Sequence, residues 1–263
     1  MDQLPREIWN QILEEAREES KKEPLLSSFL YQTILNHQFM GDALSYHLTH
    51  KLENPTLPGL MLREIIDSAF RQAPDLLNSV SLDLKAIRQR DPASYSYATA
   101  FLYFKGFHAL ESYRVTHWLW KQDRKSLAHL FQSRISEVFG VDIHPAAQIG
   151  SGILMDHASS IVIGETAVIE DNVSMLHEVT LGGTGKEEGD RHPKIRQGVL
   201  IGAGAKILGN IVIGEGAKIG AGSVVLADVP PHSTVAGVPA KKVGSTRYEN
   251  PALEMDHRFC EES

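Results

Sequence analysis

Two different periods of hydrophobic residues divide the chain near residue 138. In the first part, apolar residues recur every three to four positions, as Ile8, Ile12 and Ala16 do. This is the period of an amphipathic helix. Similar stretches, separated by prolines, lie at 25–37, 41–51 and 60–73. The pattern predicts a helical N-terminal region.

Another helix is expected after Asp91-Pro92, which suit the N-cap and first turn of a helix. The segment that follows is rich in aromatic residues from Tyr95 to Trp120. We interpret most of these aromatic side chains as helix core.

From about residue 141, the apolar positions recur every six residues. The residue four positions after each of them is small or β-branched. A period of six fits neither a helix nor a simple strand. It is typical of a parallel β-helix with a triangular section, in which three hexads make one coil of about 18 residues. The longest run is Ile195, Ile201, Ile207, Ile213, Ile219 and Val225.

Two breaks interrupt the hexads. Met155 and Ile163 are eight residues apart, and Leu181 and Ile195 are fourteen apart. The second break contains the polar stretch GGTGKEEGDRHPK, which a coil cannot absorb. We therefore predict an excursion loop at 182–194. Loops that project from rigid repeats often carry function.

Composition and charge exclude several classes of protein. The 263 residues carry 26 basic and 33 acidic side chains, and the net charge of −7 argues against general nucleic-acid binding. No apolar run approaches the roughly 20 residues of a membrane-spanning helix, and the acidic N-terminus does not resemble a secretory signal.

The single cysteine, Cys260, allows no intrachain disulfide, so a cytoplasmic location is expected. It lies in a polar tail with no recognisable base beside it, and we do not predict it to be a nucleophile.

His157 is a candidate general base at the first break. Asp142 precedes it by fifteen residues, close to one coil, so the two are expected near one corner on adjacent turns. A carboxylate that pairs with one imidazole nitrogen raises the basicity of the other. Spacing alone leaves open whether His157 is instead an ordinary histidine at a turn.

Arg191 and His192 end the excursion loop. An arginine can bind a carboxylate through two parallel hydrogen bonds, so the pair suggests a site for a small anion. The residues alone fit a solvated loop charge at least as well.

Small corner residues could leave backbone groups open to the pantetheine arm of CoA, with lysines near its phosphates. The fold requires small corners in any case, so this signal is weak. The residues are Gly182, Gly183, Ala203 and Ala221, with Lys218, Lys241 and Lys242.

A metal site is not predicted. Zinc needs three converging ligands. His157 and His177 are twenty residues apart and could partly converge, but this half has no HxH or HxxxH pair. His108, His117 and His144 add no such spacing.

Together these residues resemble the bacterial serine acetyltransferase family over nearly the whole chain. The resemblance is carried by the strings RDPASYSYATAFLYFKGFHALESYRVTHWLW, VDIHPAAQIGSGILMDHA, VTLGGTGKEEGDRHPKI and GAGAKILGNIVIG. The hexads are shared by many acyltransferases, whereas the loop and the helical region are more specific.

The resemblance implies an α + β fold, with helices followed by a left-handed parallel β-helix. It implies a helical oligomerisation domain at 1–138, a β-helix domain at 139–243 and a tail at 244–263. The family transfers the acetyl group of acetyl-CoA to L-serine, giving O-acetylserine for cysteine synthesis, and uses no metal.

Residue roles follow from the same resemblance. His157 would be the base, oriented by Asp142. The other matching positions would bind ligands. These are Asp91 and Asp156 for the serine amino group, Arg191 for its carboxylate, His192 to help position the substrate, and Gly183, Ala203 and Ala221 for CoA.

The resemblance also implies partners. Trimers would share active sites between neighbours, two trimers would form a hexamer, and L-cysteine would inhibit. Family members that dock into O-acetylserine sulfhydrylase end in isoleucine, whereas this sequence ends in Glu261-Glu262-Ser263. We therefore expect either a truncated tail or a weak or absent complex.

Three alternatives remain at the level of the residues. The first is a hexapeptide-repeat O-acetyltransferase that acts on a sugar or antibiotic hydroxyl. The others are a zinc-dependent β-helix hydratase and a non-catalytic trimeric scaffold.

Overall fold

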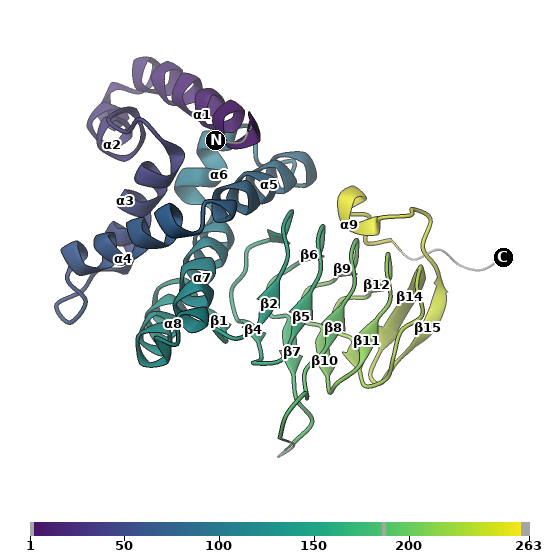
Figure 1. Cartoon of the computed structure of the whole chain (residues 1–263). Helices are drawn as coiled ribbons and strands as arrows, with labels where there is room; N and C mark the ends of the chain where they lie inside the picture. The colour runs from purple at the N-terminus through teal and green to yellow at the C-terminus, as the bar shows by residue number, and fades with distance from the viewer. Residues whose placement is uncertain (1–2, 186–187, 259–263) are drawn as a thin grey trace.

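The computed structural model describes residues 3–185 and 188–258 (Figure 1). Helices occupy the first half, and a prism of short parallel strands occupies the second. The predictions made above for Cys260 and for residues 261–263 concern residues outside the described ranges.

The helical region contains eight α-helices and two irregular turns within the described chain. Amphipathic α1 buries Ile8, Trp9, Ile12 and Ala16, as the pattern predicts. The elements are α1 (Gln3–Lys22), the 3-10 turn η1 (Pro24–Leu26), α2 (Ser27–Leu30), the π-helical turn η2 (Tyr31–Leu35), α3 (Met40–Leu52), α4 (Gly59–Gln72), α5 (Asp75–Arg90), α6 (Tyr97–Tyr103), α7 (Lys105–Lys121) and α8 (Lys125–Phe139).

The expected N-cap at Asp91 is wrong. Asp91 follows the last residue of α5, and its carboxylate accepts a hydrogen bond from the Ala93 amide (2.8 Å) in a turn. The next helix, α6, begins at Tyr97, where the Ser96 hydroxyl accepts from the Thr99 amide. The Asp91 side chain thus stabilises a local turn by accepting a backbone hydrogen bond, as aspartate side chains often do.

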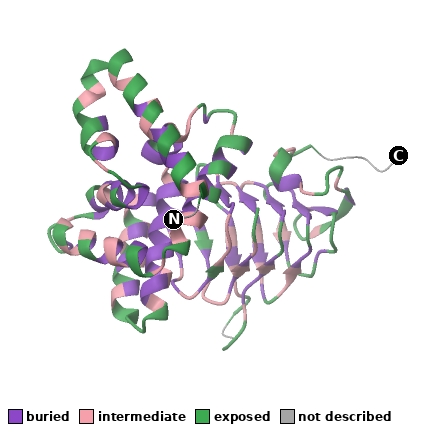
Figure 2. Cartoon of the chain, turned by 45° about the horizontal axis from the view of Figure 1, so that its top comes forward, coloured by how far each residue is buried: buried purple, intermediate pink, exposed green. Residues whose placement is uncertain are grey.

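The aromatic segment forms helix core around α6 and α7. Phe101, Phe107 and Tyr113 are almost fully buried, while Tyr95 and Tyr103 remain exposed. Helix α7 is buried on nearly every side (Figure 2), and even its charged Glu111 and Arg114 are inside.

The second half winds three sheets around one core, and their strands pair in parallel except for the antiparallel pair β14–β15. The first sheet has the order β1-β4-β7-β10-β13, the second β11-β8-β5-β2, and the third β15-β14-β12-β9-β6-β3. The strands are β1 (Val141–Ile143), β2 (Gln148–Ile149), β3 (Leu154–Met155), β4 (Ile161–Ile163), β5 (Val168–Ile169), β6 (Ser174–Met175), β7 (Thr180–Gly182), β8 (Lys194–Ile195), β9 (Leu200–Ile201), β10 (Lys206–Leu208), β11 (Val212–Ile213), β12 (Lys218–Ile219), β13 (Val224–Val225), β14 (Ser233–Gly237) and β15 (Ala240–Ser245).

The predicted hexads form this core. The five isoleucines of the hexad positions are at most 1% exposed, and Figure 2 shows the strands buried along the prism; they are Ile195, Ile201, Ile207, Ile213 and Ile219. Each coil completes the hydrogen bonds of the one before it. The fold is a helical region followed by a left-handed parallel β-helix, so the predicted fold class is confirmed.

The two breaks have the predicted effect on the coils. The paired positions Val162 and Thr180 are 18 residues apart, a normal coil. Val141 pairs with Ile161, which adds two residues, and Thr180 pairs with Lys206, which adds eight. The segment between β7 and β8, within the predicted loop, projects away from the prism (Figure 1).

The end of the described chain folds back onto the third sheet. The hairpin β14–β15 is followed by α9 (Pro251–Glu254), which packs near β9 and α5. The Lys218 ammonium group donates a hydrogen bond to the Asp256 carbonyl (3.1 Å) and another to the Arg258 carbonyl. Lys218 is buried, so the expectation that it meets a phosphate is not supported.

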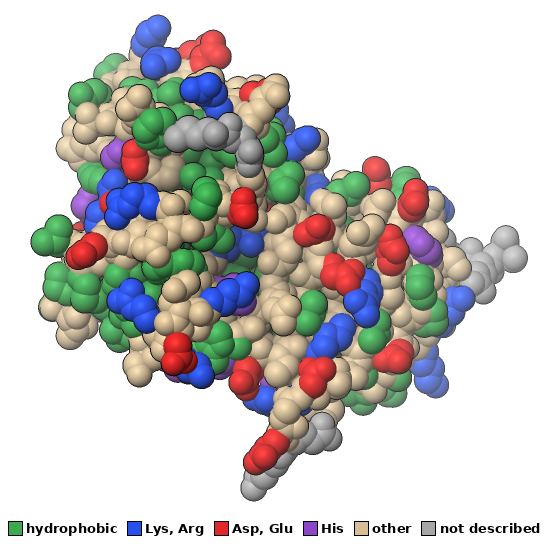
Figure 3. All heavy atoms as spheres, in the orientation of Figure 1, with side chains coloured by type: hydrophobic (Ala, Val, Ile, Leu, Met, Phe, Trp, Pro, Cys, Tyr) green, Lys and Arg blue, Asp and Glu red, His purple; other side chains and the backbone are tan. Residues whose placement is uncertain are grey.

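None of the helices in the described ranges is long and apolar enough to cross a membrane. On the face drawn in Figure 3, basic and acidic side chains are interspersed rather than gathered into one basic track.

Candidate active site

His157 lies at the edge of the prism that joins the third sheet to the first. We call this the His157 edge; it comprises residues 156–160, 176–179, 202–205 and 220–223. The two additional residues of the first break widen the corner here. His157 (φ 55°), Ala158 (φ 57°) and Ser160 (φ 61°) all adopt the left-handed conformation. Each such non-glycine residue costs about 1–3 kcal/mol, and such strain concentrates at functional sites.

The His157 side chain is open to solvent, with 75% of its surface exposed. Its Nε2 atom lies 3.9 Å from Asp156 Oδ1, and its ring faces the edge of His177 with 6.0 Å between centroids. The imidazole is thus free to accept a proton from a bound molecule.

His157 begins a column of equivalent positions along this edge. The core residues Met155, Met175, Ile201 and Ile219 pair from coil to coil. Two residues after each of them comes one member of the column. Its members are His157, His177, Ala203 and Ala221. Two histidines therefore continue into two alanines, which leave the edge open to an extended ligand.

The N-terminus of α7 packs directly on the widened corner. A Cβ atom on Gly106 would lie 2.0 Å from the Met155 carbonyl oxygen, so only glycine fits there. The Lys105 ammonium group donates a hydrogen bond to the Ser159 hydroxyl. The helical region thus fixes the turn that carries His157.

Asp142 lies near the same edge, in β1. Two residues before it, the Gly140 carbonyl accepts a hydrogen bond from the Ser160 amide (2.7 Å). The Asp142 carboxylate instead accepts from Gln132 Nε2 of α8 (2.7 Å). Among the described residues no hydrogen bond joins Asp142 to His157, so their pairing stays a prediction.

Arg191 and His192 lie at the edge that joins the first sheet to the second. We call this the Arg191 edge; it comprises residues 144–147, 164–167, 183–193 and 208–211, of which 186–187 are not described. Arg191 Nη2 pairs with Glu165 Oε2 (2.6 Å), and its guanidinium lowers the pKa of that carboxyl. Gly183 lies against the same arginine.

His192 is buried at this edge, with 7% of its surface exposed. Burial lowers the pKa of its imidazole, and the Arg191 charge lowers it further. Burial likewise lowers the pKa of His144, which lies on the same edge. We therefore expect both side chains to be neutral at neutral pH, when they can donate or accept hydrogen bonds without adding charge.

Apart from Asp91, which follows α5 in the helical region, the predicted residues form two groups on opposite borders of the first sheet. His157, Asp156, Ala203 and Ala221 lie on one edge, and Arg191, His192 and Gly183 lie on the other. At about 3.3 Å per residue, the strand between the two edges separates them by roughly 16 Å. One small amino acid cannot touch both groups within a single chain.

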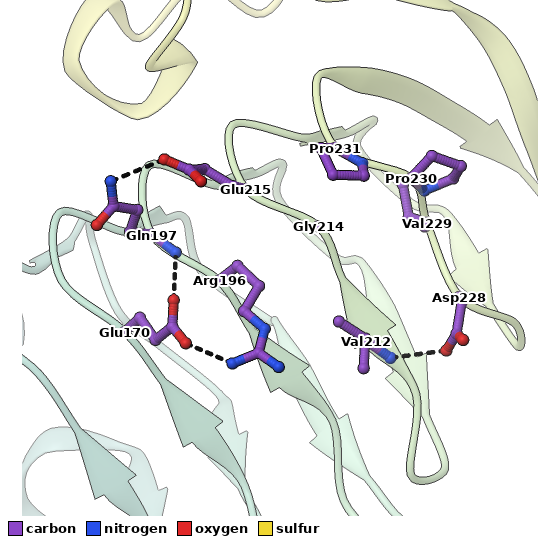
Figure 4. A pocket seen from close by; sticks show the side chains of 10 residues that line it. All are labelled: Glu170, Arg196, Gln197, Val212, Gly214, Glu215, Asp228, Val229, Pro230 and Pro231. Carbon is purple, nitrogen blue, oxygen red and sulfur yellow. Dashed lines mark hydrogen bonds and ion pairs between the residues drawn. The ribbon is translucent and has the colours of Figure 1, made fainter.

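A shallow pocket of about 560 Å³ lies at the third edge of the prism and contains none of the predicted residues (Figure 4). Its charged side chains bond to one another or to the backbone. Arg196 pairs with Glu170 (2.5 Å), and Gln197 donates to Glu215 (2.8 Å). Groups satisfied in this way are poor candidates for binding a ligand.

No group of three or more His, Cys, Asp and Glu side chains is arranged to hold a metal ion within 3–185 and 188–258. The rings of His157 and His177 lie near each other, with 6.0 Å between their centroids, but within the described ranges no third ligand joins them.

Comparison with known proteins decides the family. The family model "Serine acetyltransferase, N-terminal" matches residues 8–112, and "Bacterial transferase hexapeptide (six repeats)" matches 192–227. Serine acetyltransferase of Escherichia coli (strain K12) is 56% identical over 252 residues, which are 96% of this chain and 92% of that protein. The chain belongs to the serine acetyltransferase family. The resemblance seen in the sequence is confirmed.

Solved structures of serine acetyltransferases have the same fold. The crystal structure from Vibrio cholerae has a TM-score of 0.95 and 56% identity, covering 97% of this chain and 98% of that one. A serine acetyltransferase complex with cysteine has a TM-score of 0.95 and 55% identity, covering 97% and 100%. A complex with CoA has a TM-score of 0.88 and 56% identity, covering 91% and 100%.

Two polar contacts to the predicted serine acetyltransferase site escaped sequence reasoning. One is Gln132, whose helical position gives no sign of its contact with Asp142. The other is Thr166, whose hydroxyl lies 2.9 Å from His192 Nδ1. Thr166 could have been found, because it precedes His192 by one 18-residue coil once the eight added residues of the loop are removed.

Proposed function

We propose that His157 is the general base for acetyl transfer from acetyl-CoA to L-serine, the activity of the family to which this chain belongs. The observation that carries the proposal is the exposed imidazole of His157 on a strained corner. His157 is the first member of the column that continues through His177 to Ala203 and Ala221. A solvent-exposed imidazole can reach a bound hydroxyl, as a general base must.

The chemistry requires one proton to move twice. As the serine Oγ atom bonds to the thioester carbonyl carbon, its proton passes to the imidazole. The tetrahedral intermediate then breaks its C–S bond, and the departing CoA thiolate takes the proton from the imidazolium. The products are O-acetyl-L-serine and CoA, and no acyl-enzyme forms. Asp142 would orient the base once the site is assembled.

The remaining residues bind the two substrates. Asp91 and Asp156 carry negative charge for the serine ammonium group, while Arg191 and His192 supply donors for its carboxylate. Gly183, Ala203 and Ala221 leave backbone groups open to the CoA arm. Complexes of relatives with CoA and with cysteine, and a soybean relative with serine, support these ligands.

We further propose that the site forms between two copies of the chain. The separation of roughly 16 Å between the two edges supports this, because the His157 edge of one copy could face the Arg191 edge of the next. A closed ring of such contacts makes a trimer. The helical domain, residues 1–138, would join two trimers into a hexamer. L-Cysteine, which resembles serine, would bind the same site and inhibit the enzyme.

We place this reaction in the cytoplasm, which is a reducing compartment, because a chain with a single cysteine forms no intrachain disulfide. Its product enters cysteine biosynthesis.

The test is release of free CoA from acetyl-CoA with L-serine. L-Homoserine, a simple sugar and no acceptor serve as controls. Release that requires L-serine and is lost in His157→Ala supports the proposal. Release with the sugar but not with serine would contradict it and favour a hexapeptide-repeat transferase of another acceptor.

A further inference from the structure

The hydroxyl of Thr166 is the centre of a group of hydrogen bonds at the Arg191 edge. Its Oγ1 accepts from the Arg191 amide (3.0 Å) and from the His192 amide (3.1 Å). The same oxygen lies 2.9 Å from His192 Nδ1. One side chain therefore contacts the backbone of both residues and the ring of one.

The hydrogens at this centre can be assigned by counting donors and acceptors. A hydroxyl has two lone pairs and one proton. The two amides occupy both lone pairs of Oγ1, so its own proton is left to donate, and the acceptors beside it are His192 Nδ1 and the Asp190 carboxylate. Hydrogen bonds from Lys194 and, less strongly, from Thr166 lower the pKa of that carboxyl. The Thr166 amide donates to His192 Nδ1 as well (3.2 Å). Nδ1 is therefore an acceptor, and a neutral imidazole carries its proton on Nε2.

The ring of His192 is also fixed from its other side. A Cβ atom built on Gly164 would lie 2.0 Å from Nε2 and from Cδ2 of this ring. The imidazole thus occupies the space that any other residue at 164 would fill. Packing holds the plane of the ring, and Thr166 decides which nitrogen carries the proton.

The hydrogen bonds between Thr166 and the chain at 191–194 lie where the excursion loop returns to the prism. Lys194, the first residue of β8, donates through Nζ to the Thr166 carbonyl (2.9 Å). Thr166 is hydrogen-bonded to Arg191, His192 and Lys194, and so connects the end of the loop to the prism.

We propose that Thr166 is a positioning residue for substrate binding. It sets the backbone that carries Arg191 and the tautomer of His192, so that a guanidinium and an Nε2–H group are presented to the carboxylate of the amino-acid substrate. This inference rests on the proposed function, which assigns Arg191 and His192 to that carboxylate.

Two substitutions separate the hydroxyl from the shape of the side chain. Thr166→Val keeps the shape and removes the hydroxyl, while Thr166→Ser keeps the hydroxyl. The full-length enzyme is assayed with L-serine and acetyl-CoA. Thr166→Val should raise the KM for serine about 10- to 100-fold, the effect of leaving a buried polar group unpaired. The KM for acetyl-CoA should stay within about twofold, and Thr166→Ser should restore serine binding.

Thr246→Val is the matched control. Thr246 comes just after the last strand, β15, away from the Arg191 edge, and its hydroxyl donates to the backbone carbonyl of His232 (3.3 Å), so the loss of this hydroxyl should leave both KM values unchanged. Equal impairment of Thr166→Val and Thr166→Ser would overturn the inference, because shape rather than the hydroxyl would then matter. A proportional rise of both KM values in Thr166→Val would overturn it as well.

Arg191→Ala and His192→Ala distinguish this inference from the proposed function. If neither raises the KM for serine, the assignment of the carboxylate site fails, and with it the inference. If they raise it while Thr166→Val behaves like wild type, only the role of Thr166 fails. In the His192→Ala background, Thr166→Val should raise the KM for serine by a smaller factor than in wild type, since the contact of Thr166 with the His192 ring is already gone.

Discussion

Arg114 and Asp83 form a buried ion pair that joins the helical region to the first coil of the β-helix. Arg114 Nε donates to Asp83 Oδ2 (3.1 Å), and its Nη2 donates to the Gly150 carbonyl (2.8 Å). The other oxygen of Asp83 accepts from the Ile153 amide (2.7 Å). Through these bonds α5 and α7 are joined to Gly150 and Ile153 in the first coil of the prism.

A second carboxyl, Glu111, lies beside this pair with Arg114 Nε at 3.3 Å. Burial raises its pKa well above the usual range, Arg114 opposes the shift, and Asp83 adds to it. Folded chains therefore hold a proton that unfolded chains release above about pH 4.5. The contribution of Glu111 to the free energy of unfolding is therefore lost as the pH rises from about 4.5 toward the pKa that Glu111 has in the folded chain.

Glu111→Gln should consequently flatten the dependence of stability on pH. The amide mimics the protonated acid, so the variant should gain stability relative to wild type between about pH 5 and pH 8. Thermal unfolding midpoints measured at both values provide the test. Glu137→Gln, an exposed glutamate paired with Arg134, is the control. A constant difference between wild type and Glu111→Gln would contradict the prediction.

Acid should destabilise the helical region through His47. Burial, with a smaller contribution from the Lys51 charge, lowers its pKa to about 4. Between about pH 6.5 and 4 the unfolded chain binds a proton that the folded chain does not, so stability falls as pH decreases through this range. The loss amounts to roughly 3 kcal/mol at pH 4.

His47→Asn should reduce this acid sensitivity, since asparagine does not titrate. Unfolding midpoints at pH 7.5 and 5.0 should differ less in the variant than in wild type. His50→Asn, one position of the same helix that is exposed, should keep the wild-type difference. An unchanged difference in His47→Asn would remove His47 from the explanation.

His157→Ala should lower kcat by about 10²–10⁴-fold, the usual range for a positioned base. The KM values should change little by comparison. Steady-state release of CoA measures both parameters, and His50→Ala provides a histidine control outside the site. Turnover close to wild type in a folded variant would exclude His157 as the base.

Arg191→Ala should raise the KM for serine and leave the KM for acetyl-CoA unchanged, because its guanidinium is proposed to bind the serine carboxylate. Arg196→Ala is a close control. Arg196 also pairs with a glutamate on an edge of the prism, but it lies in the pocket of Figure 4. An effect confined to acetyl-CoA would show that the role of Arg191 is wrong.

Gln132→Leu should lower kcat about 10-fold, as expected when the support of an orienting carboxylate is lost. The effect should nearly vanish in an Asp142→Asn background, because Gln132 acts through Asp142. Gln72→Leu, on α4, should be silent. Independent, additive losses in the double variant would mean that Gln132 contributes in some other way.

The sequence by itself determined the fold and the chemistry of most candidate residues. A core position every six residues is a local pattern, because each coil buries the same part of its own hexads from Ile195 to Ile219. The two breaks marked the corner of His157 and the loop that ends at Arg191. Residues at these places could be named before any contact was known.

Only the tertiary structure decided how those residues are grouped. Asp91 follows α5 instead of capping a helix, and Asp142 bonds to Gln132, because these contacts depend on where α5 and α8 meet the first coil. The division between the His157 edge and the Arg191 edge arises from the closing of three sheets into a prism. The contact of Gln132 with Asp142 joins a helix to the first coil, and no period along the sequence specifies it.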